Sequence, residues 1–489
     1  MKMKNSSIRA SHLLLLLLLA SSWNIPVVES AAFAIPRQAR RGGPLLASLE
    51  KNLNFAIIGA GPSGLLLAHR LLLANKGKVS IFESRSDPRL NLLEGRAYAL
   101  GIGKRGRTAI RSVDNLLWEA VKARGYESER FTLYIAGIKL KLRDGDGGTT
   151  GVEPSVLMYQ SDLCAALLDE LETRYNHNQL SIIFDAKVMN CDLNKMTITT
   201  STSTPESSIQ PPFDLIVGCD GVNSVVRDAI TSCSPSFEST KTLLPGDFKV
   251  CRLDQVPPMV DPTSVCLILP SSGSTTAFIE PTANGSCILF AGRNKEDPIL
   301  NPTSVDETAA QLEKSFPLLK GIDFYHLAEQ LKNQTTSSAS SVKCNTYHYS
   351  DTAVLVGDAA HATGGVSGQG VNSALIDAMV LADCLSECDT KQQALLKYSK
   401  RQVPEGLALY DLSFGPTPTG ALGIKYKLQG VLDSLFRGQF GIGQLPLQTL
   451  LTTTLEPFAK VRKSKNQFYE TEFPSQKDFD AQIDRLSQD

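Results

Sequence analysis

The stretch Phe55–Glu83, FAIIGAGPSGLLLAHRLLLANKGKVSIFE, limits what this chain can fold into more than any other. An apolar strand leads into a turn that carries Gly59, Gly61 and Gly64, a helix follows, and a second strand ends on Glu83. Glycines at this spacing allow a tight turn, bring bare backbone close to a pyrophosphate and let the helix pack on the strand, while the acid can bind a ribose hydroxyl. The pyrophosphate would lie at the helix N-terminus, where free N–H groups favour negative charge. The stretch therefore predicts a dinucleotide-binding βαβ unit, with a glycine turn in a cofactor-free α/β domain as the alternative.

Two later segments bring a glycine and an acid to the end of a buried strand. In Asp214–Arg227, DLIVGCDGVNSVVR, the acid is Asp220, and in Val354–Asn372, VLVGDAAHATGGVSGQGVN, Gly357 precedes Asp358. Ligands of open α/β sheets bind at the carboxyl ends of the strands, so we expect both segments to meet the glycine turn there. The Asp358 carboxylate can then accept hydrogen bonds from the ribityl hydroxyls of a flavin.

The helix that follows the second of these segments adds a further donor group. It begins at Gly368, Gln369, Gly370, Val371 and Asn372, whose backbone N–H groups can face the pyrimidine edge of a flavin. Negative charge develops at that edge when the ring is reduced, and a helix N-terminus stabilises it. Taken singly, an aspartate after a strand can be an N-cap and GQG can be a turn. Three such segments in this order predict FAD.

The rest of the chain predicts how this unit is elaborated. With 489 residues, 42% of them hydrophobic, and a net charge of −1, the chain can bury a large core and has no basic field that would indicate nucleic acid. We expect an α/β fold in which a Rossmann-like FAD-binding domain is interleaved with a substrate domain made of a mostly antiparallel β-sheet, followed by C-terminal helices. The FAD-binding domain is expected at 52–130, 151–235 and 342–390, the substrate sheet at 131–150 and 236–341, a helical region at 391–470 and a tail at 471–489. The glycine-rich turn DGDGG is expected to join strands at Phe131–Leu142 and Ser155–Tyr159.

Residues 1–44 predict targeting. Lys2, Lys4 and Arg9 precede the leucine run Leu13–Leu19, as in a signal peptide, and this run is too short to span a bilayer. Small residues around Phe33 then lead into a basic stretch without acids. This arrangement resembles the bipartite presequence of plastid proteins in diatoms and related algae, a signal peptide followed by a transit peptide. An ordinary secreted protein is the alternative.

Ten cysteines and six histidines are dispersed along the chain. Several of the cysteines lie inside apolar runs, where small buried thiols belong, and no disulfide framework is apparent. A reducing compartment such as a plastid stroma therefore fits better than the extracellular space. Because neither an HExxH nor a CxxC pattern is present, we expect no protein-bound metal.

Taken together, these segments resemble the class A flavoprotein monooxygenases, the single-component aromatic hydroxylases, and within them the kynurenine 3-monooxygenase family. The resemblance runs from about Asn54 to about Asn466. Besides the glycine turn and GQGVN, it rests on GRAYALGIGKRGR (Gly95–Arg107), the segment Asp220–Arg227, SSVKCNTYHYSDTAVLVGDAAHA (Ser340–Ala362) and RQVPEGLALYDLS (Arg401–Ser413).

The resemblance implies FAD as cofactor, NADPH as cosubstrate, and O2 activated as a flavin C4a-hydroperoxide that transfers one oxygen atom to an electron-rich ring. These enzymes bind NADPH without a second Rossmann unit. The formal GxGxxG at Gly101–Gly106, GIGKRG, agrees with this, because no strand ending in an acid follows it. No catalytic side chain is expected, since catalysis consists of placing a ring beside the flavin in a dry cavity. The expected cofactor-binding residues are Gly59, Gly61, Ser63, Gly64, Glu83, Arg96, Gln160, Asp220, Gly357, Asp358, Gly368, Gly370, Val371 and Asn372.

The substrate is less well defined by the sequence. Arg130, in SERFTLY, falls where the kynurenine enzymes have an arginine that pairs with the substrate carboxylate, and a solvated charge at a strand edge is the other interpretation. The DGDGG turn replaces a tyrosine expected downstream, and FGPTPTG follows DLS where an asparagine and a tyrosine are expected. Gln160 occupies the place of a flavin-contacting arginine. A plastid carotenoid or isoprenoid epoxidase and a non-oxygenating flavoprotein reductase therefore remain alternatives to a small-molecule hydroxylase.

The stretch Leu422–Gln467 resembles the helices that cap the substrate chamber in the kynurenine enzymes. Its apolar runs are too short to span a membrane, and the hydrophobic anchor of the animal enzymes does not follow it. We expect no transmembrane anchor in the mature chain, with peripheral membrane contact through this stretch as the alternative.

Overall fold

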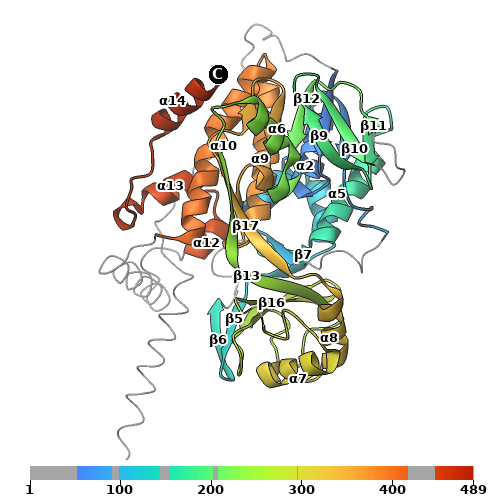
Figure 1. Ribbon diagram of the computed structural model, residues 1–489, viewed down its shortest axis with the longest axis vertical. Coiled ribbons are helices and arrows are strands. Elements are labelled where there is room, and N and C mark those ends of the chain that lie inside the picture. The colour runs from blue at the N-terminus through green and yellow to red at the C-terminus, as the bar shows by residue number, and fades with distance from the viewer. Residues whose placement is uncertain are drawn as a thin grey trace, which may run out of the picture.

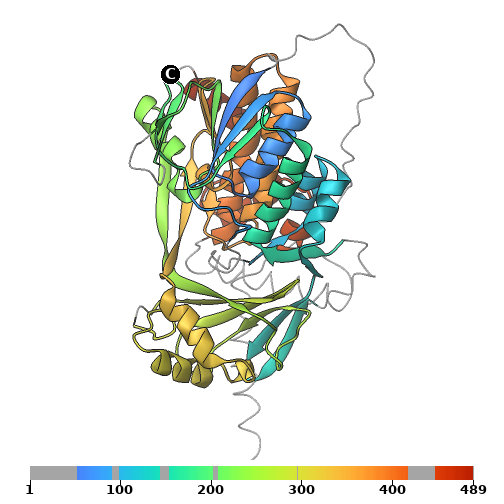
Figure 2. The ribbon, with the colours of Figure 1, turned by 90° about the vertical axis from the view of Figure 1, so that its right-hand side faces the viewer.

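The computed structural model describes residues 52–90, 99–143, 153–201, 208–294, 296–416 and 447–487. These residues form an upper part built on a parallel sheet and most of the helices, and a lower part built on a large antiparallel sheet (Figures 1 and 2). The chain passes between the two parts several times, so the domains are interleaved. The expected α/β fold is confirmed.

The parallel sheet contains the strand before the glycine turn. Its strands lie in the order β18–β19–β12–β1–β2–β8, and only β18 runs antiparallel to its neighbour. The bounds are β1 (Leu53–Ile58), β2 (Gly77–Phe82), β8 (Leu180–Ile183), β12 (Leu215–Gly218), β18 (His348–Tyr349) and β19 (Ala353–Leu355). Because β12 and β19 are buried along their whole length, continuous apolar runs fit these central positions.

Helices α2 (Pro62–Leu73), α5 (Gln160–Arg174), α9 (Gly370–Glu387) and α10 (Lys391–Phe414) pack against one another in this upper part (Figure 1). Helix α6 (Val225–Cys233) contacts β12 and β19. It also contacts a small sheet of β9 (Lys187–Asp192), β10 (Thr197–Ser201) and β11 (Ser208–Ile209).

The large antiparallel sheet has the order β20–β17–β13–β16–β15–β14–β5–β6, and only β5 and β14 pair in parallel. The bounds are β5 (Phe131–Ile135), β6 (Ile138–Arg143), β13 (Ser239–Leu253), β14 (Val265–Ile268), β15 (Thr276–Thr282), β16 (Gly285–Gly292), β17 (Ser337–Cys344) and β20 (Ala362–Thr363). Helices α7 (Val305–Ser315) and α8 (Phe324–Asn333) cover its lower face (Figure 1). Buried side chains from both, including Ile279, Phe290, Leu312 and Leu331, form one core there.

A third sheet, formed by β3 (Ala99–Ile102), β7 (Ser155–Tyr159) and β4 (Tyr126–Ser128), lies between the two parts. Helices α3 (Lys104–Arg111) and α4 (Asn115–Lys122) follow β3, and α12 (Leu447–Thr453), α13 (Phe458–Lys463) and α14 (Gln476–Leu486) end the described chain. None of the helices that the structure describes combines the length and the apolar character needed to cross a bilayer.

Three expectations about the elements need correction. The stretch Phe131–Leu142 is a hairpin that turns at Ala136 and Gly137, both with positive φ (48° and 78°), and β7 pairs with β3 and β4 instead of β6. The region 236–341, expected as part of the mostly antiparallel substrate sheet, also contains α7 and α8. Residues 471–487 are not only a tail, because α14 buries Phe479 against the rest of the chain.

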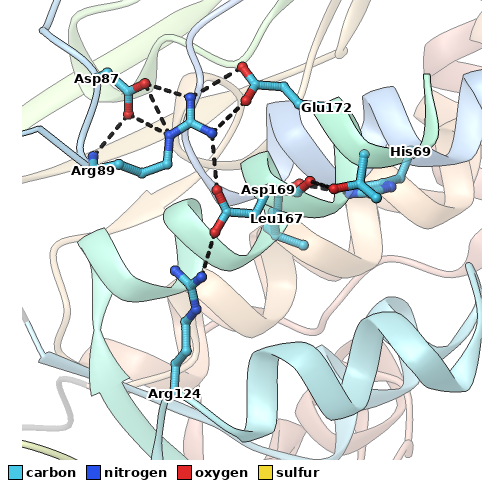
Figure 3. Close-up of polar contacts among 8 residues, drawn as sticks. His69, Asp87, Arg89, Arg124, Leu167, Asp169 and Glu172 are labelled. Atoms are coloured by element: carbon cyan, nitrogen blue, oxygen red, sulfur yellow. Dashed lines mark hydrogen bonds and ion pairs between the residues drawn. The ribbon is translucent and has the colours of Figure 1, made fainter. Parts of the chain in front are cut away.

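Polar contacts fix the loop after β2 onto α5, as Figure 3 shows. The Arg89 guanidinium binds the carboxylates of Asp87, Asp169 and Glu172, with its Nη1 3.0 Å from Asp169 and 2.6 Å from Glu172. Asp169 also binds Arg124. These side chains are partly exposed, so the network positions the loop more than it stabilises the fold.

Candidate cofactor and substrate site

Three strands of the parallel sheet end side by side. Ile58 of β1 is paired in register with Gly218 of β12, which is paired in turn with Leu355 of β19. Parallel strands in register present their carboxyl ends at one edge of the sheet. The three glycine- and acid-containing segments predicted from the sequence therefore emerge together, at the edge where ligands of such sheets bind.

The glycine turn is closely packed on one side and open on the other. Gly59 has φ of +106°, and a Cβ there would lie 2.4 Å from the carbonyl oxygen of Cys219. A Cβ on Gly64 would lie 2.2 Å from the Gly59 oxygen, whereas a Cβ on Gly61 would meet nothing within 4 Å. Gly61 is the N-cap of α2, which has no side-chain cap and no acid in its first turn. The space beside Gly61 at this uncapped helix N-terminus is therefore open, which fits a pyrophosphate.

Glu83 lies beside this turn. Its carboxylate accepts hydrogen bonds of 2.9 Å from the backbone N–H groups of Ala60 and Arg85. The carboxylate is thus held at the end of the neighbouring strand, where its remaining lone pairs fit a ribose hydroxyl. Ser63 is buried in the first turn of α2, and a Cβ on Gly357 would lie 3.4 Å from its Oγ.

A second helix N-terminus meets the strand end of β19. A Cβ on Gly370, the first residue of α9, would lie 3.9 Å from Oδ1 of Asp358. The Asp358 side chain is accessible to solvent yet densely surrounded by protein, and this desolvation raises the pKa of its carboxyl. Helix α9 also lacks a side-chain cap and an acid in its first turn, where Val371 is half-buried. The Oε1 of its N-cap residue Gln369 is buried without a hydrogen-bond partner among the described residues.

Asn372 connects this helix end to the GIGKRG segment. Its Oδ1 accepts hydrogen bonds from the backbone of Gly103 (2.9 Å) and Gly106 (3.2 Å), and its Nδ2 donates to Gly101 (2.9 Å). Gly368, with φ of +64°, makes the turn that precedes the helix. The second glycine pattern therefore braces α9.

Only one of the two carboxylate oxygens of Asp220 is hydrogen-bonded to the described part of the chain. Its Oδ2 accepts a 2.7 Å hydrogen bond from the backbone of Val225, and its Oδ1 is buried without a partner in the described part of the chain. Burial raises the pKa of this carboxyl, although the hydrogen bonds oppose the effect. An orphaned acceptor at the ligand-binding edge of the sheet fits a cofactor hydroxyl.

The structure leaves three expected residues without evidence of a place in this group. Arg96 lies outside the described residues, so its position is not tested. Gln160 is half-buried at the first position of α5, next to β7. Arg130 is exposed and donates a 2.7 Å hydrogen bond to the Thr263 hydroxyl. The roles assigned to these three residues stay predictions.

The structure also shows a buried pair that sequence reasoning missed. Oδ2 of Asp377 lies 2.7 Å from Nε2 of His361 and accepts a 3.1 Å hydrogen bond from the backbone of Gly357. Burial alone would lower the pKa of His361, but Asp377 raises it above its usual value. The pair is sixteen positions apart in sequence, a separation that corresponds to no spacing rule. The three strand ends and the two uncapped helix N-termini, with the His361–Asp377 pair beside them, form a site that fits FAD.

Comparison with known proteins agrees with this geometry. Residues 52–413 match the family described as FAD binding domain. The chain belongs to this family. It is 26% identical over 453 residues to the kynurenine 3-monooxygenase of Caenorhabditis briggsae, covering 83% of this chain and 91% of the relative. The chain is thus an oxidoreductase of the FAD-dependent monooxygenases.

Solved structures share the fold. The tetrameric form of 2-methyl-3-hydroxypyridine-5-carboxylic acid oxygenase superposes with a TM-score of 0.60 at 20% identity, over 87% of this chain and 100% of that one. Klebsiella pneumoniae HpxO, solved with FAD and uric acid, gives a TM-score of 0.53 at 15% identity, over 89% and 96%. The parallel sheet, the mostly antiparallel sheet and the C-terminal helices belong to this shared architecture.

Proposed function

We propose that this protein is an FAD-dependent, NADPH-using monooxygenase that inserts one oxygen atom from O2 into a small aromatic substrate, in the manner of kynurenine 3-monooxygenase. The observation that carries the proposal is the row of three strand ends facing the uncapped N-termini of α2 and α9. One helix end fits the pyrophosphate, and the other fits the pyrimidine edge of a flavin. The names of the relatives supply the reaction class.

Bound FAD would supply the redox chemistry that O2 activation needs. The residues of this chain would bind and orient it. The α2 N-terminus would hold the pyrophosphate, Glu83 and Asp358 would accept hydrogen bonds from ribose and ribityl hydroxyls, and the first turn of α9 would stabilise negative charge on the ring. The large antiparallel sheet would close the other side of the reaction space and exclude water.

The proposed substrate is a small aromatic compound. Kynurenine is the first candidate within this class, because the relatives that match most of the chain are kynurenine enzymes. Arg130 is the proposed partner of a substrate carboxylate. Its side chain is exposed and donates a hydrogen bond to the Thr263 hydroxyl. A carotenoid or isoprenoid epoxidase and a non-oxygenating reductase are the competing functions.

Anaerobic stopped-flow reduction of the FAD-loaded protein tests the proposal. Flavin bleaching by NADPH is followed alone and with kynurenine, simple phenols or xanthophylls, and NADH replaces NADPH in a parallel series. Incorporation of 18O from 18O2 is then measured for each compound that accelerates bleaching. Acceleration and labelling by an aromatic compound support the proposed function.

The other outcomes separate the competing functions. Labelling of a xanthophyll alone identifies an epoxidase. Steady NADPH oxidation that no compound accelerates, with no label incorporated, identifies a reductase. A protein that takes up no FAD contradicts all three.

We also propose plastid delivery through residues 1–44, which lie outside the described residues. Three observations support plastid delivery: the basic residues at the N-terminus, the leucine run Leu13–Leu19 and the basic stretch that follows it. A fluorescent protein fused behind residues 1–44 should enter the complex plastid of a diatom, and the fusion should stop in the secretory pathway if residues 30–44 are removed. Secretion of the full fusion contradicts the proposal.

A further inference from the structure

The upper face of the large antiparallel sheet differs from the lower one. Side chains alternate along β15, so Ala277 and Ile279 are fully buried under α7 and α8, while Phe278 and Glu280 point to the opposite face. On that face, Phe278 is half-buried and lies 6.0 Å, centroid to centroid, from the half-buried Phe131 of β5. The upper face is therefore an apolar, aromatic wall that the described residues cover incompletely.

Contacts with β7 show that this wall faces the FAD-binding part. The Tyr159 hydroxyl donates a 2.9 Å hydrogen bond to the backbone of Ser286, and the Arg252 guanidinium lies 3.9 Å from the centre of the Tyr159 ring. Tyr159 packs with Val250 and Cys287, which belong to the same face as Glu280. Glu280 thus lies between the Tyr159 contact and the aromatic pair.

Glu280 has no partner in this position. Its Oε2 is buried, and the side chain makes no hydrogen bond or ion pair with any other described residue. Burial alone raises the pKa of its carboxyl to about 7. The fold gains nothing from a buried acceptor left unpaired, because desolvation of the group is uncompensated.

Arg252 does not supply the missing contact. Register places Cys287 directly opposite both Arg252 and Glu280, so the two charged residues are separated by a whole strand, about 9–10 Å across the sheet. The guanidinium turns away to stack on Tyr159 and to donate to the Ser161 hydroxyl at 3.3 Å. The carboxyl of Glu280 is therefore not paired with Arg252.

We propose that Glu280 determines substrate specificity by accepting a hydrogen bond from an N–H or O–H group of the aromatic substrate, whose ring lies against Phe278 and Phe131. This inference rests on the proposed function, since it concerns the compound that lies between the sheet and the flavin. A carboxylate accepts from such a donor, whereas a methylated analogue of the ligand leaves it unpaired. A carboxylate group on the ligand would be repelled at this position.

Ligand binding to the FAD-loaded protein tests the proposal through pairs of compounds that differ in the donor. The pairs are phenol and anisole, aniline and N,N-dimethylaniline, and indole and 1-methylindole, with dissociation constants taken from the change in flavin absorbance. The wild type should bind each donor at least about tenfold more tightly than its methylated partner. In Glu280→Leu this preference should disappear, and in Glu280→Gln it should persist without the change between pH 6 and pH 8 that the wild type shows.

Two further measurements guard against a structural explanation. Because Glu280 has no partner in the fold, the melting temperature of FAD-free Glu280→Leu should equal or exceed that of the wild type. The matched control, Glu313→Gln, changes an exposed acid on the outer helix α7 and should alter neither ligand preference nor melting temperature.

The proposal is overturned if Glu280→Leu keeps the donor preference, if it loses donors and methylated partners equally, if it melts below the wild type, or if the wild type binds no donor-bearing compound of the panel. These results can be distinguished from a failure of the proposed function. If the proposed function fails, FAD uptake or 18O incorporation is absent, while the melting comparison of the FAD-free proteins still reports on Glu280.

Discussion

Gly59 and Gly61 are two residues apart in one turn, yet the structure gives them different tasks. Gly59 has φ of +106° and a Cβ would lie 2.4 Å from a backbone oxygen of the neighbouring segment, so Gly59→Ala combines backbone strain with a clash. We expect this substitution to lower the free energy of unfolding by about 2 kcal/mol or more. Urea unfolding of the FAD-free protein measures the loss.

Gly61→Ala is the matched comparison. The backbone at Gly61 is extended, with φ of −75° and ψ of 175°, and the new methyl group would meet no protein atom. The free energy of unfolding should therefore change by no more than about 0.5 kcal/mol. FAD affinity, measured by fluorescence titration, should fall at least about tenfold, because the methyl group occupies the space in front of the α2 N-terminus. Unchanged FAD affinity would show that the pyrophosphate does not pass there.

At the scale of elements, His69 links α2 to α5 and makes their packing sensitive to acid. Its Nε2 lies 3.0 Å from the backbone oxygen of Leu167, as drawn in Figure 3, and the ring is fully buried. Burial lowers the pKa of His69 from 6.5 to about 4, so the unfolded chain binds the proton more tightly. The contribution of neutral His69 to the free energy of unfolding is complete above pH 6.5. It is lost as the pH falls toward 4, and the loss is about 3 kcal/mol at most.

Replacement of this ring isolates its share of the acid sensitivity. The free energy of unfolding of the wild type and of His69→Gln should be measured by urea titration from pH 7.5 to pH 4.5. The difference between them should be constant above pH 6.5 and should shrink below it, because only the wild type must exclude a proton from this site. His348, whose pKa burial also lowers to about 4, remains in both proteins and cancels in the comparison. A difference that does not depend on pH would contradict the linkage.

The elements that sequence could predict are those with a local signal. A buried strand that ends at a glycine or an acid can be recognised from its own residues. The segments that end at Gly59, Asp220 and Asp358 are predicted in this way. Helix α7 also has a local signal, since Ser304 caps it and Glu307 follows three residues later, but the whole range 236–341 is expected from the sequence to form the substrate sheet.

Other features depend on contacts that no local pattern contains. The choice of β3 and β4 as partners for β7 follows from how the two parts of the molecule pack, and the glycine-rich turn before it gave no hint of this. The orphaned carboxyl of Glu280 is similar, because alternation predicts two faces for β15 but does not say which face lies toward the flavin. The pairing of His361 with Asp377 likewise exists only after the chain has folded.

At the scale of the whole molecule, two charged side chains, one buried and one half-buried, hold the C-terminal helices in place. Arg105 of α3 donates to the backbone oxygens of Leu451 and Glu456 and lies 4.0 Å from the centre of the Phe458 ring. Glu405 of α10 accepts hydrogen bonds from the backbone of Phe458, at 2.7 Å, and of the next residue. Burial lowers the pKa of Arg105 to about 10 and raises the pKa of Glu405, so each charge is retained against a desolvation cost.

Arg105→Met should therefore release the C-terminal segment. The substitution keeps the apolar stem but leaves two carbonyl oxygens, one of them buried, without their donor and removes the cation near Glu405, at a cost of about 3 kcal/mol. Limited proteolysis should cut within 447–487 sooner than in the wild type. The control Arg485→Met removes an exposed arginine from the same segment and should not change the cleavage rate.

Arg105→Met should also weaken FAD binding, because Gly103 and Gly106, on either side of Arg105, bind Asn372 at the start of α9. FAD affinity should therefore fall together with protease resistance. A loss of only one of the two would show that the C-terminal helices and the cofactor site are independent.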